Sequence, residues 1–447
     1  MHTCLNGISK MIYTQFLLAA TAGLLLLLLF KKWAQYRGIP PGPWGLPIVG
    51  YMPFLLKGDP IQMFQEFKKK YGKVFSISIG NFNCVVINDY KLIIEAYKED
   101  VFLGRPAFEI QITRSHGQKR GILFAEGNVW AEQRRFAART LRNFGIGNKN
   151  SMETLLQNEA QELGNFLAAN VDKPMSLKSR FNASVLNSLW YICTGSRFDV
   201  EDPDFLFLIT NIIDNFQKAE STGVVFFFPW VLKKDFLIKG FWKKYLETRD
   251  KTQGLIKASI AEHEKTYSPT ENRDLIDALI EHRKKSNNPD SSFYGSEGEM
   301  NQLIVLLDLF VAGAETSSSI LQWAMLYMII WPEVQAKVQE EIDSVIGSSR
   351  IPSLEDKPNM IYTEAVLCEI HRFCTLVPFS VYHSTLADTK FAGYKIPKDT
   401  CIFANMRDAH HDKEFQKVPG ATLSIQPNAK TFIVAPKPYE IIIQTRA

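Results

Sequence analysis

The most apolar stretch in the interior of the chain runs from Leu303 to Trp331 and is hydrophobic around the whole circumference of a helix. A surface helix would carry a polar face, so this pattern predicts a helix through the middle of a folded domain. The stretch is long enough to cross a bilayer, but Asp308 and Glu315 interrupt it and neither flank resembles a membrane boundary. We therefore expect a buried core helix around which the rest of the chain packs.

A second apolar run lies in residues 1–30, where Ile12 to Phe30 contains no charged side chain and ends in consecutive leucines. Its length fits a transmembrane helix. Basic residues are more frequent directly after this run than before it, so the positive-inside rule places the main domain in the cytosol. We expect a single-pass N-terminal signal anchor.

Prolines dominate the next segment, residues 31–50, which includes the sequence Ile39-Pro-Pro-Gly-Pro-Trp-Gly-Leu-Pro47. Proline cannot continue a helix and stiffens an extended chain. The segment is predicted to be a hinge that either sets the angle between membrane and domain or only provides spacing. One large domain over residues 51–447 follows.

Apolar and polar residues alternate over Phe75–Ile79, and the following Gly80–Asn83 and Cys84–Ile87 have the composition of a turn and a strand, so a small β-hairpin is predicted. Most of the sequence from Tyr90 to Ile280 has helical spacing. An aromatic cluster at Phe226–Trp230 belongs either to the core or to a surface that dips into the membrane.

Beyond the core helix, Pro332 stands where helices commonly start, and apolar residues recur on one face until Gly347. Lys390–Pro397 and Thr431–Thr445 are β-rich and broken by proline, as expected of a second small sheet. The predicted fold class is mainly α with small β-sheets.

Composition adds limits on function. The 447 residues carry a net charge of only +4, which does not indicate nucleic-acid binding. The six cysteines show neither metal-ligand spacing nor a disulfide framework, so a reducing, cytosol-facing domain fits.

Small and polar residues interrupt the core helix at Ala312, Gly313, Glu315 and Thr316. The Thr316 hydroxyl can bond back to the carbonyl of Ala312, opening the helix beside Gly313 and leaving a polar notch. The notch is either a site for a small polar molecule or the place where another helix crosses closely.

Two further pairs of residues are spaced to share a helical face. Trp130 and Arg134 present an indole N–H beside a guanidinium, which suits an anionic ligand, although a helix packed through Trp130 with solvated arginines gives the same pattern. Glu369 and Arg372 form either part of a buried polar network or a surface ion pair.

Taken together and in this order, these features resemble the cytochromes P450, the haem-thiolate monooxygenases, of the membrane-anchored animal type. Val377-Pro378 and His383 add to the resemblance, which extends to about Phe415. The stretch from Gly121 to Gly145 looks especially like the second, drug- and hormone-metabolising group of the family. The resemblance implies a cytochrome P450 fold.

The same resemblance implies roles for individual residues around a haem cofactor. Trp130, Arg134 and His383 would hold the haem propionates through charge-assisted hydrogen bonds. Ala312 and Gly313 would line the side of the haem where oxygen binds.

Glu315 and Thr316 would be catalytic residues that deliver protons for cleavage of the O–O bond. Glu369 and Arg372 would stabilise the side of the haem opposite the oxygen.

One expected element of the family is absent. Its C-terminal Phe-x-x-Gly-x-x-x-Cys-x-Gly loop carries the sulfur ligand, and no cysteine follows Cys401. The sequence after Phe415 soon reaches Ala435–Ile443, which resembles the family's terminal strand, so the fold is expected to be truncated internally near the C-terminus. Cys401 is predicted to enter a short strand, and no metal ligand is assigned.

The resemblance implies an endoplasmic-reticulum membrane monooxygenase that oxidises a xenobiotic, steroid or other lipid with dioxygen. Electrons would come from NADPH–cytochrome P450 reductase, with cytochrome b5 as a second candidate partner. The missing loop supports an alternative, a catalytically inactive, haem-poor splice or deletion variant that binds a ligand or the reductase. A third explanation is a transcript with a skipped exon.

Overall fold

The computed structural model describes most of the large domain. The described residues are 38–144, 151–200, 202–207, 209–210, 227, 240–411 and 440–443, with 15, 21 and 23. The predicted anchor and most of the predicted C-terminal strand region lie outside these residues.

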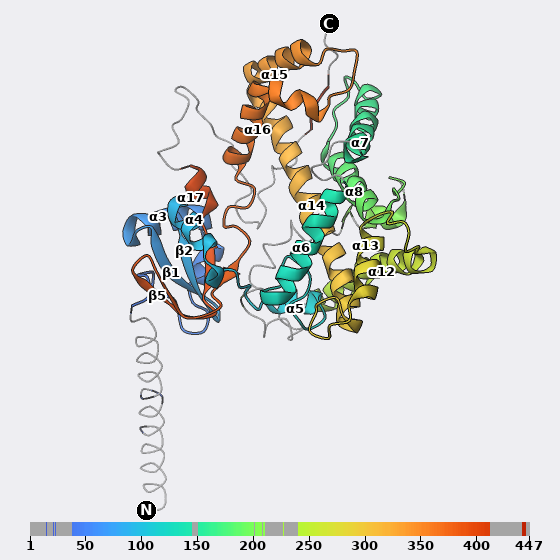
Figure 1. The fold of residues 1–447 in the computed structure, drawn as a ribbon. Coiled ribbons are helices and arrows are strands. Elements are labelled where there is room, and N and C mark those ends of the chain that lie inside the picture. Colours follow the sequence, from blue (N-terminus) through green and yellow to red (C-terminus); the bar gives the residue numbers. More distant parts are fainter. Residues whose placement is uncertain are drawn as a thin grey trace, which may run out of the picture.

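Helix α14, Gly295–Ile330, runs through the centre of the molecule (Figure 1). Among the described helices it alone is long and apolar enough to cross a membrane, but 61% of its most apolar window is buried inside the protein. The predicted core helix is therefore confirmed. The helix begins two turns before the predicted Leu303, because buried Asn301 donates hydrogen bonds to the carbonyls of Ser292 and Glu297 and is accommodated in the core.

Helix α8, Lys178–Thr194, is packed most extensively against α14. The indole of Trp190 stacks on the ring of Phe310 with 5.1 Å between centroids. A β-carbon at Gly313 would approach Leu189 to 2.7 Å, so the absence of a side chain lets the two helices come close.

Further helices surround these two and form the helical part seen at the right and top of Figure 1. Their bounds are as follows: α5 Glu109–Arg114, α6 Gly127–Asn143, α7 Ser151–Ala168, α12 Phe241–Thr266, α13 Leu275–Lys285, α15 Pro332–Val345 and α16 Ile361–Cys374. The predicted helix after Pro332 is confirmed by α15, which ends before Gly347 at a φ of 73°.

The β-sheets lie on the other side of the molecule, at the left of Figure 1. The main sheet has the order β1-β2-β6-β3, and a separate hairpin pairs β4 with β5. The strands are β1 Val74–Ile79, β2 Phe82–Ile87, β3 His383–Ser384, β4 Thr389–Phe391, β5 Tyr394–Ile396 and β6 Cys401–Ala404. The predicted early hairpin and the predicted β-region Lys390–Pro397 are confirmed, and most of the third, Thr431–Thr445, lies outside the described residues.

Short helices pack beside this sheet. They are α2 Met52–Lys57, α3 Pro60–Tyr71, α4 Tyr90–Lys98 and α17 Met406–His410, with the 3₁₀ turn η1 Asp100–Phe102. A second 3₁₀ turn, η2 Leu354–Asn359, lies in the helical part next to α16. Phe227, from the predicted aromatic cluster, is buried beside Phe82 and Phe108, which supports the core alternative for this residue.

The proline-rich segment from residue 38 onward packs against β1. Ser76 donates its amide to the carbonyl of Pro41 at 2.8 Å and its hydroxyl to the carbonyl of Pro40 at 2.7 Å. A β-carbon at Gly42 would overlap the carbonyl of Ser76. This contact explains why all six residues of β1 are buried although its sequence alternates.

Candidate functional site

Helix α6 carries the first pair of predicted donors. It packs into the core through Phe136, which belongs to the same hydrophobic cluster as Leu307 and Phe310 of α14. Trp130 is only half-buried, and the Arg134 guanidinium lies 5.1 Å from its ring centroid. Trp130 and Arg134 share a face of α6, as predicted. The helix packs into the core through Phe136 and not through Trp130.

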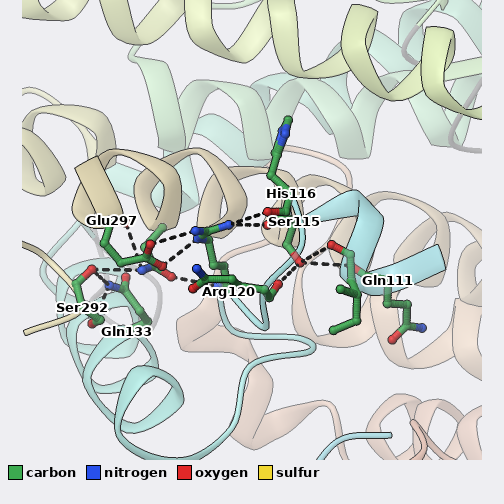
Figure 2. Close-up of polar contacts among 11 residues, drawn as sticks. Gln111, Ser115, His116, Arg120, Gln133, Ser292 and Glu297 are labelled. Carbon is green, nitrogen blue, oxygen red and sulfur yellow. Dashed lines mark hydrogen bonds and ion pairs between the residues drawn. The ribbon is translucent and has the colours of Figure 1, made fainter. Parts of the chain in front are cut away.

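A polar network fixes α6 and the preceding loop to the start of α14 (Figure 2). Buried Arg120 forms two hydrogen bonds with Glu297, at 2.6 and 2.8 Å, and donates to the carbonyl of Ser115 at 2.6 Å. From α6, Gln133 donates to the carbonyl and hydroxyl of Ser292 at 3.2 and 2.9 Å. The orientation of α6 is therefore set by contacts with the N-terminal end of the core helix.

Arg105 is a candidate site residue that the sequence predictions did not include. Its Nη1 donates to the carbonyl of Tyr382 at 3.0 Å, and its Nε is buried without a hydrogen-bond partner among the described residues. Burial lowers the pKa of Arg105 to about 10, and the nearby positive charge of Arg134 contributes in the same direction. The signal available in the sequence was a basic residue in Gly104-Arg105-Pro106, between apolar segments.

His383 lies in β3 next to the residue that accepts the Arg105 hydrogen bond. Its ring meets Tyr97 edge-on with 4.5 Å between centroids, and its Nδ1 is buried without a hydrogen-bond partner in the described part of the chain. Burial lowers the pKa of His383 to about 3, with a further contribution from Arg105. The imidazole is therefore neutral at physiological pH and has an unused nitrogen.

The structure thus brings together donors from three segments: Arg105 before α5, Arg134 on α6 and His383 in β3. The guanidinium groups of Arg105 and Arg134 repel each other, and one buried nitrogen of Arg105 and one of His383 have no hydrogen-bond partner among the described residues. An anionic ligand would offset the repulsion and provide the missing hydrogen bonds. Haem carries two propionate carboxylates, so this donor set fits the acidic edge of haem. Trp130 adds an indole N–H on the same face of α6.

On α14, the Thr316 hydroxyl donates to the carbonyl of Ala312 at 2.6 Å, as predicted from the sequence. The helix continues as a regular α-helix through this turn, so the expected opening of the helix does not occur. Ala312 is exposed and Thr316 partly so, whereas Gly313 faces Leu189 of α8. The close-crossing alternative therefore applies to Gly313, and Ala312 and Thr316 form an accessible face.

Glu315 has a different environment from its neighbour Thr316. Its side chain is buried, with Oε1 accepting from the Ser319 hydroxyl at 3.5 Å and Oε2 lacking a hydrogen-bond partner among the described residues. Burial raises the pKa of Glu315 to about 7, and the charge of Lys178 on α8 partly opposes the shift. This carboxyl can gain or lose a proton near neutral pH, but it lies toward α8.

No cysteine in the described part of the chain is placed to ligate a haem iron from the donor cluster. Cys401 is fully buried in β6, as predicted, and its register partner in the parallel ladder is Cys84. The two thiols are hydrogen-bonded, and burial raises the pKa of Cys401 well above its usual value. The residues present fit the carboxylate edge of haem but do not fit thiolate ligation.

The Glu369–Arg372 pair forms on α16 but is not buried. Arg372 Nε donates to Glu369 at 2.7 Å and Nη1 donates to the carbonyl of His410 at 2.7 Å. The Glu369 side chain is 57% exposed, so the buried-network interpretation is wrong and the surface ion pair is correct. Leaving part of the Glu369 carboxylate without a protein partner costs little stability, because water can solvate its free lone pairs. Cys368 on the same helix is also exposed, because α16 turns that face outward.

One cluster with metal-ligand chemistry lies between α12 and α13, where His263, Asp274 and Asp277 approach one another. His263 Nε2 bonds to Asp274 at 2.8 Å, and Arg273 bonds to Asp277 at 2.6 and 2.9 Å. The three side chains are satisfied by protein partners, so the cluster links the two helices.

Comparisons with known proteins agree with this geometry. The protein-family model described as cytochrome P450 matches residues 40–419. Cytochrome P450 2J2 of Homo sapiens is 36% identical over 408 residues, which are 90% of this chain and 79% of that protein. Cytochrome P450 2J3 of Rattus norvegicus is 35% identical over 421 residues, or 93% and 82% of the two chains.

A relative from a distant animal is similar to nearly the same extent. Cytochrome P450 2L1 of Panulirus argus is 34% identical over 392 residues, covering 86% of this chain and 78% of its own length. Because the family match and these relatives cover most of the sequence, the chain belongs to the cytochrome P450 family of haem-dependent monooxygenases, which are oxidoreductases.

Proposed function

We propose that this protein oxidises a lipophilic small molecule, a xenobiotic, steroid or other lipid, at the endoplasmic-reticulum membrane. Dioxygen and electrons from NADPH–cytochrome P450 reductase would be the other reactants. The observation that carries the proposal is the convergence of Arg105, Arg134 and His383. One buried nitrogen of Arg105 and one of His383 lack hydrogen-bond partners among the described residues, and Arg134 adds an exposed cation beside them.

These donors would hold the haem by its acidic edge, together with Trp130. Arg105, with a pKa of about 10, stays charged at neutral pH, and His383 contributes a neutral hydrogen-bonding nitrogen. Binding two carboxylates would remove the repulsion between the two guanidinium groups. Haem binding would therefore also stabilise the folded protein. Haem, when bound, supplies electron transfer and the activation of oxygen.

Arg105→Gln is expected to weaken haemin binding by the purified protein about tenfold or more, since one charged hydrogen bond to a carboxylate is lost. The measurement is a haemin titration followed by absorbance, with circular dichroism as a check of folding. Arg135→Gln is the matched control, because Arg135 is exposed on α6 and outside the donor cluster. Equal affinity of the Arg105 and Arg135 variants would contradict this role for Arg105.

On the oxygen side, Thr316 would hold and pass a proton on the accessible face of α14, beside Ala312. Its hydroxyl hydrogen is directed to the Ala312 carbonyl, so the oxygen lone pairs remain available to accept a hydrogen bond from a donor on the accessible face of α14. Glu315, with a pKa near 7, would exchange protons with the region next to α8. Nothing among the described residues bonds these two side chains to each other, so a relay between them needs an intervening group.

In a form of the protein that carries the Cys loop, Thr316→Ala is expected to uncouple oxygen consumption from product formation. General acid catalysis contributes about 10²–10⁴-fold, so the product formed per dioxygen should fall at least about tenfold. Substrate affinity should change little. Ser318→Ala is the control, because Ser318 makes the same back-bond, at 2.7 Å to Ala314, but is buried on another face. Unchanged coupling in Thr316→Ala would favour a purely structural role.

The missing sulfur ligand supports a second candidate function, a haem-poor variant that binds a hydrophobic ligand or the reductase without turnover. No cysteine follows position 401, and the described cysteines lie elsewhere in the fold. The two candidates differ in the spectrum of the haem-loaded protein.

The domain organisation is part of the proposal. Residues 1–30 would anchor the protein in the membrane, residues 31–50 would form the hinge, and residues 51–447 would form the cytosolic monooxygenase domain, without the haem-thiolate loop after about 415. Support comes from the charge distribution around the apolar run. Protease treatment of intact microsomes tests the orientation.

The reductase, and cytochrome b5 as a second partner, would meet the basic face of α6. Arg135 and Arg142 are exposed on this helix, and neither forms an ion pair among the described residues. Charge reversal of both is expected to slow association with the reductase and to flatten its salt dependence. Lys390→Glu, in the exposed part of the β4–β5 hairpin, is the control. Identical association rates in all three proteins would exclude α6 as the docking face.

A further inference from the structure

A cavity lies on the side of α6 opposite to the proposed haem donors. It has a volume of about 380 Å³ and is formed by the C-terminal half of α6 and by α13. Phe136 and Arg139 contribute to it, and helical spacing places them across the helix axis from Trp130 and Arg134. The cavity is therefore separate from the site described above.

The cavity has an aromatic wall. The rings of Phe136 and His282 are 4.7 Å apart and inclined by only 34°, and Phe293 packs edge-on to both. Burial lowers the pKa of His282, with a further contribution from the charge of Arg139. The imidazole is neutral at physiological pH and makes no side-chain hydrogen bond within the described part of the chain, so it offers a ring face and unused nitrogens to a ligand.

The rim of the cavity carries Arg139, a cation without an ion-pair partner among the described residues. Across the opening, Glu281 is occupied by Asn272 at 2.6 Å and by a salt bridge with Lys285. Arg139, by contrast, has no ion-pair partner among the described residues, and Asn143 follows one helical turn later on the same edge. The free positive charge and the neighbouring amide select for an anion, while the aromatic wall selects for a planar apolar body.

We propose that this cavity binds a small planar aromatic carboxylate. Its ring would lie against the wall of Phe136 and His282, and its carboxylate would accept hydrogen bonds from Arg139 and Asn143. The volume is within the range of small-molecule pockets. The site does not depend on haem, since neither its wall nor its rim includes a proposed haem donor.

The test uses the purified full chain and 4-fluorobenzoate as probe, with binding followed by fluorine NMR. Arg139→Gln is expected to weaken binding about tenfold, the effect of losing one charged hydrogen bond. The neutral analogue 4-fluorobenzamide, which keeps the ring but not the charge, should bind less tightly than the acid by a similar factor. Arg135→Gln should change the affinity less than about twofold, since an exposed charge near the rim acts only through solvent.

Arg134→Gln separates this cavity from the proposed haem side. If Arg134→Gln weakens 4-fluorobenzoate binding and Arg139→Gln does not, the acid occupies the haem donors and the proposal fails. Three other results would also overturn the proposal. They are equal affinity for the acid and the amide, equal effects of the Arg139 and Arg135 substitutions, and no binding at millimolar concentrations of the probe.

Discussion

The reduced, carbon-monoxide-treated protein is expected to lack the absorption band of thiolate-ligated haem. The reason is the donor chemistry of this chain: no cysteine follows Cys401, and Cys401 is buried in β6 with its thiol bonded to Cys84. A raised thiol pKa disfavours the thiolate that a haem iron requires. Haem held through its carboxylates by Arg105, Arg134 and His383 would have a nitrogen or water ligand instead of sulfur and show a different spectrum.

The experiment compares the carbon-monoxide difference spectrum with the haem content determined independently on the same sample. Cys401→Ser is expected to leave the spectrum unchanged. A thiolate band proportional to the haem content would refute the prediction, and its loss in Cys401→Ser would then identify the sulfur donor.

The second large effect is expected for Asp308→Ala, which should destabilise the protein by about 3–5 kcal/mol, the cost of breaking a buried ion pair. Asp308 is buried in α14 and forms a salt bridge with Arg114. Its carboxylate also accepts from the amides of Ile122 and Leu123 at 2.7 and 2.9 Å. Removal leaves a largely buried guanidinium and two amides without their acceptor.

Urea unfolding followed by circular dichroism measures the loss, and trypsin should cleave the segment between Arg114 and Phe124 faster in the variant. Asp250→Ala is the matched control, because Asp250 is 60% exposed and pairs only with its neighbour Arg249. It should change the free energy of unfolding by less than about 1 kcal/mol. A similarly small change in Asp308→Ala would show that the loop is held mainly by the Arg120–Glu297 network.

Several positions show why local sequence reasoning was sufficient for some elements and failed for others. The turn from Ile79 to Phe82 and the start of α15 at Pro332 are set by neighbouring residues, so they were predicted closely. The exposure of Glu369 depends on what packs over α16, which spacing within the helix does not determine. For the same reason, the sequence left two alternatives for Gly313, a polar notch or a close helix crossing, and the approach of Leu189 from α8 decides for the crossing.

The sequence by itself determined the family, the mainly α class, the buried central helix and the absence of a cysteine after position 401. These follow from hydrophobic periodicity and from the order of short motifs, which are local properties of the chain. Only the tertiary structure decided that Arg105 joins Arg134 and His383, and that Cys401 is paired with Cys84. Both depend on which distant segments become neighbours in the fold, and burial then sets the pKa of each group through the loss of water around it.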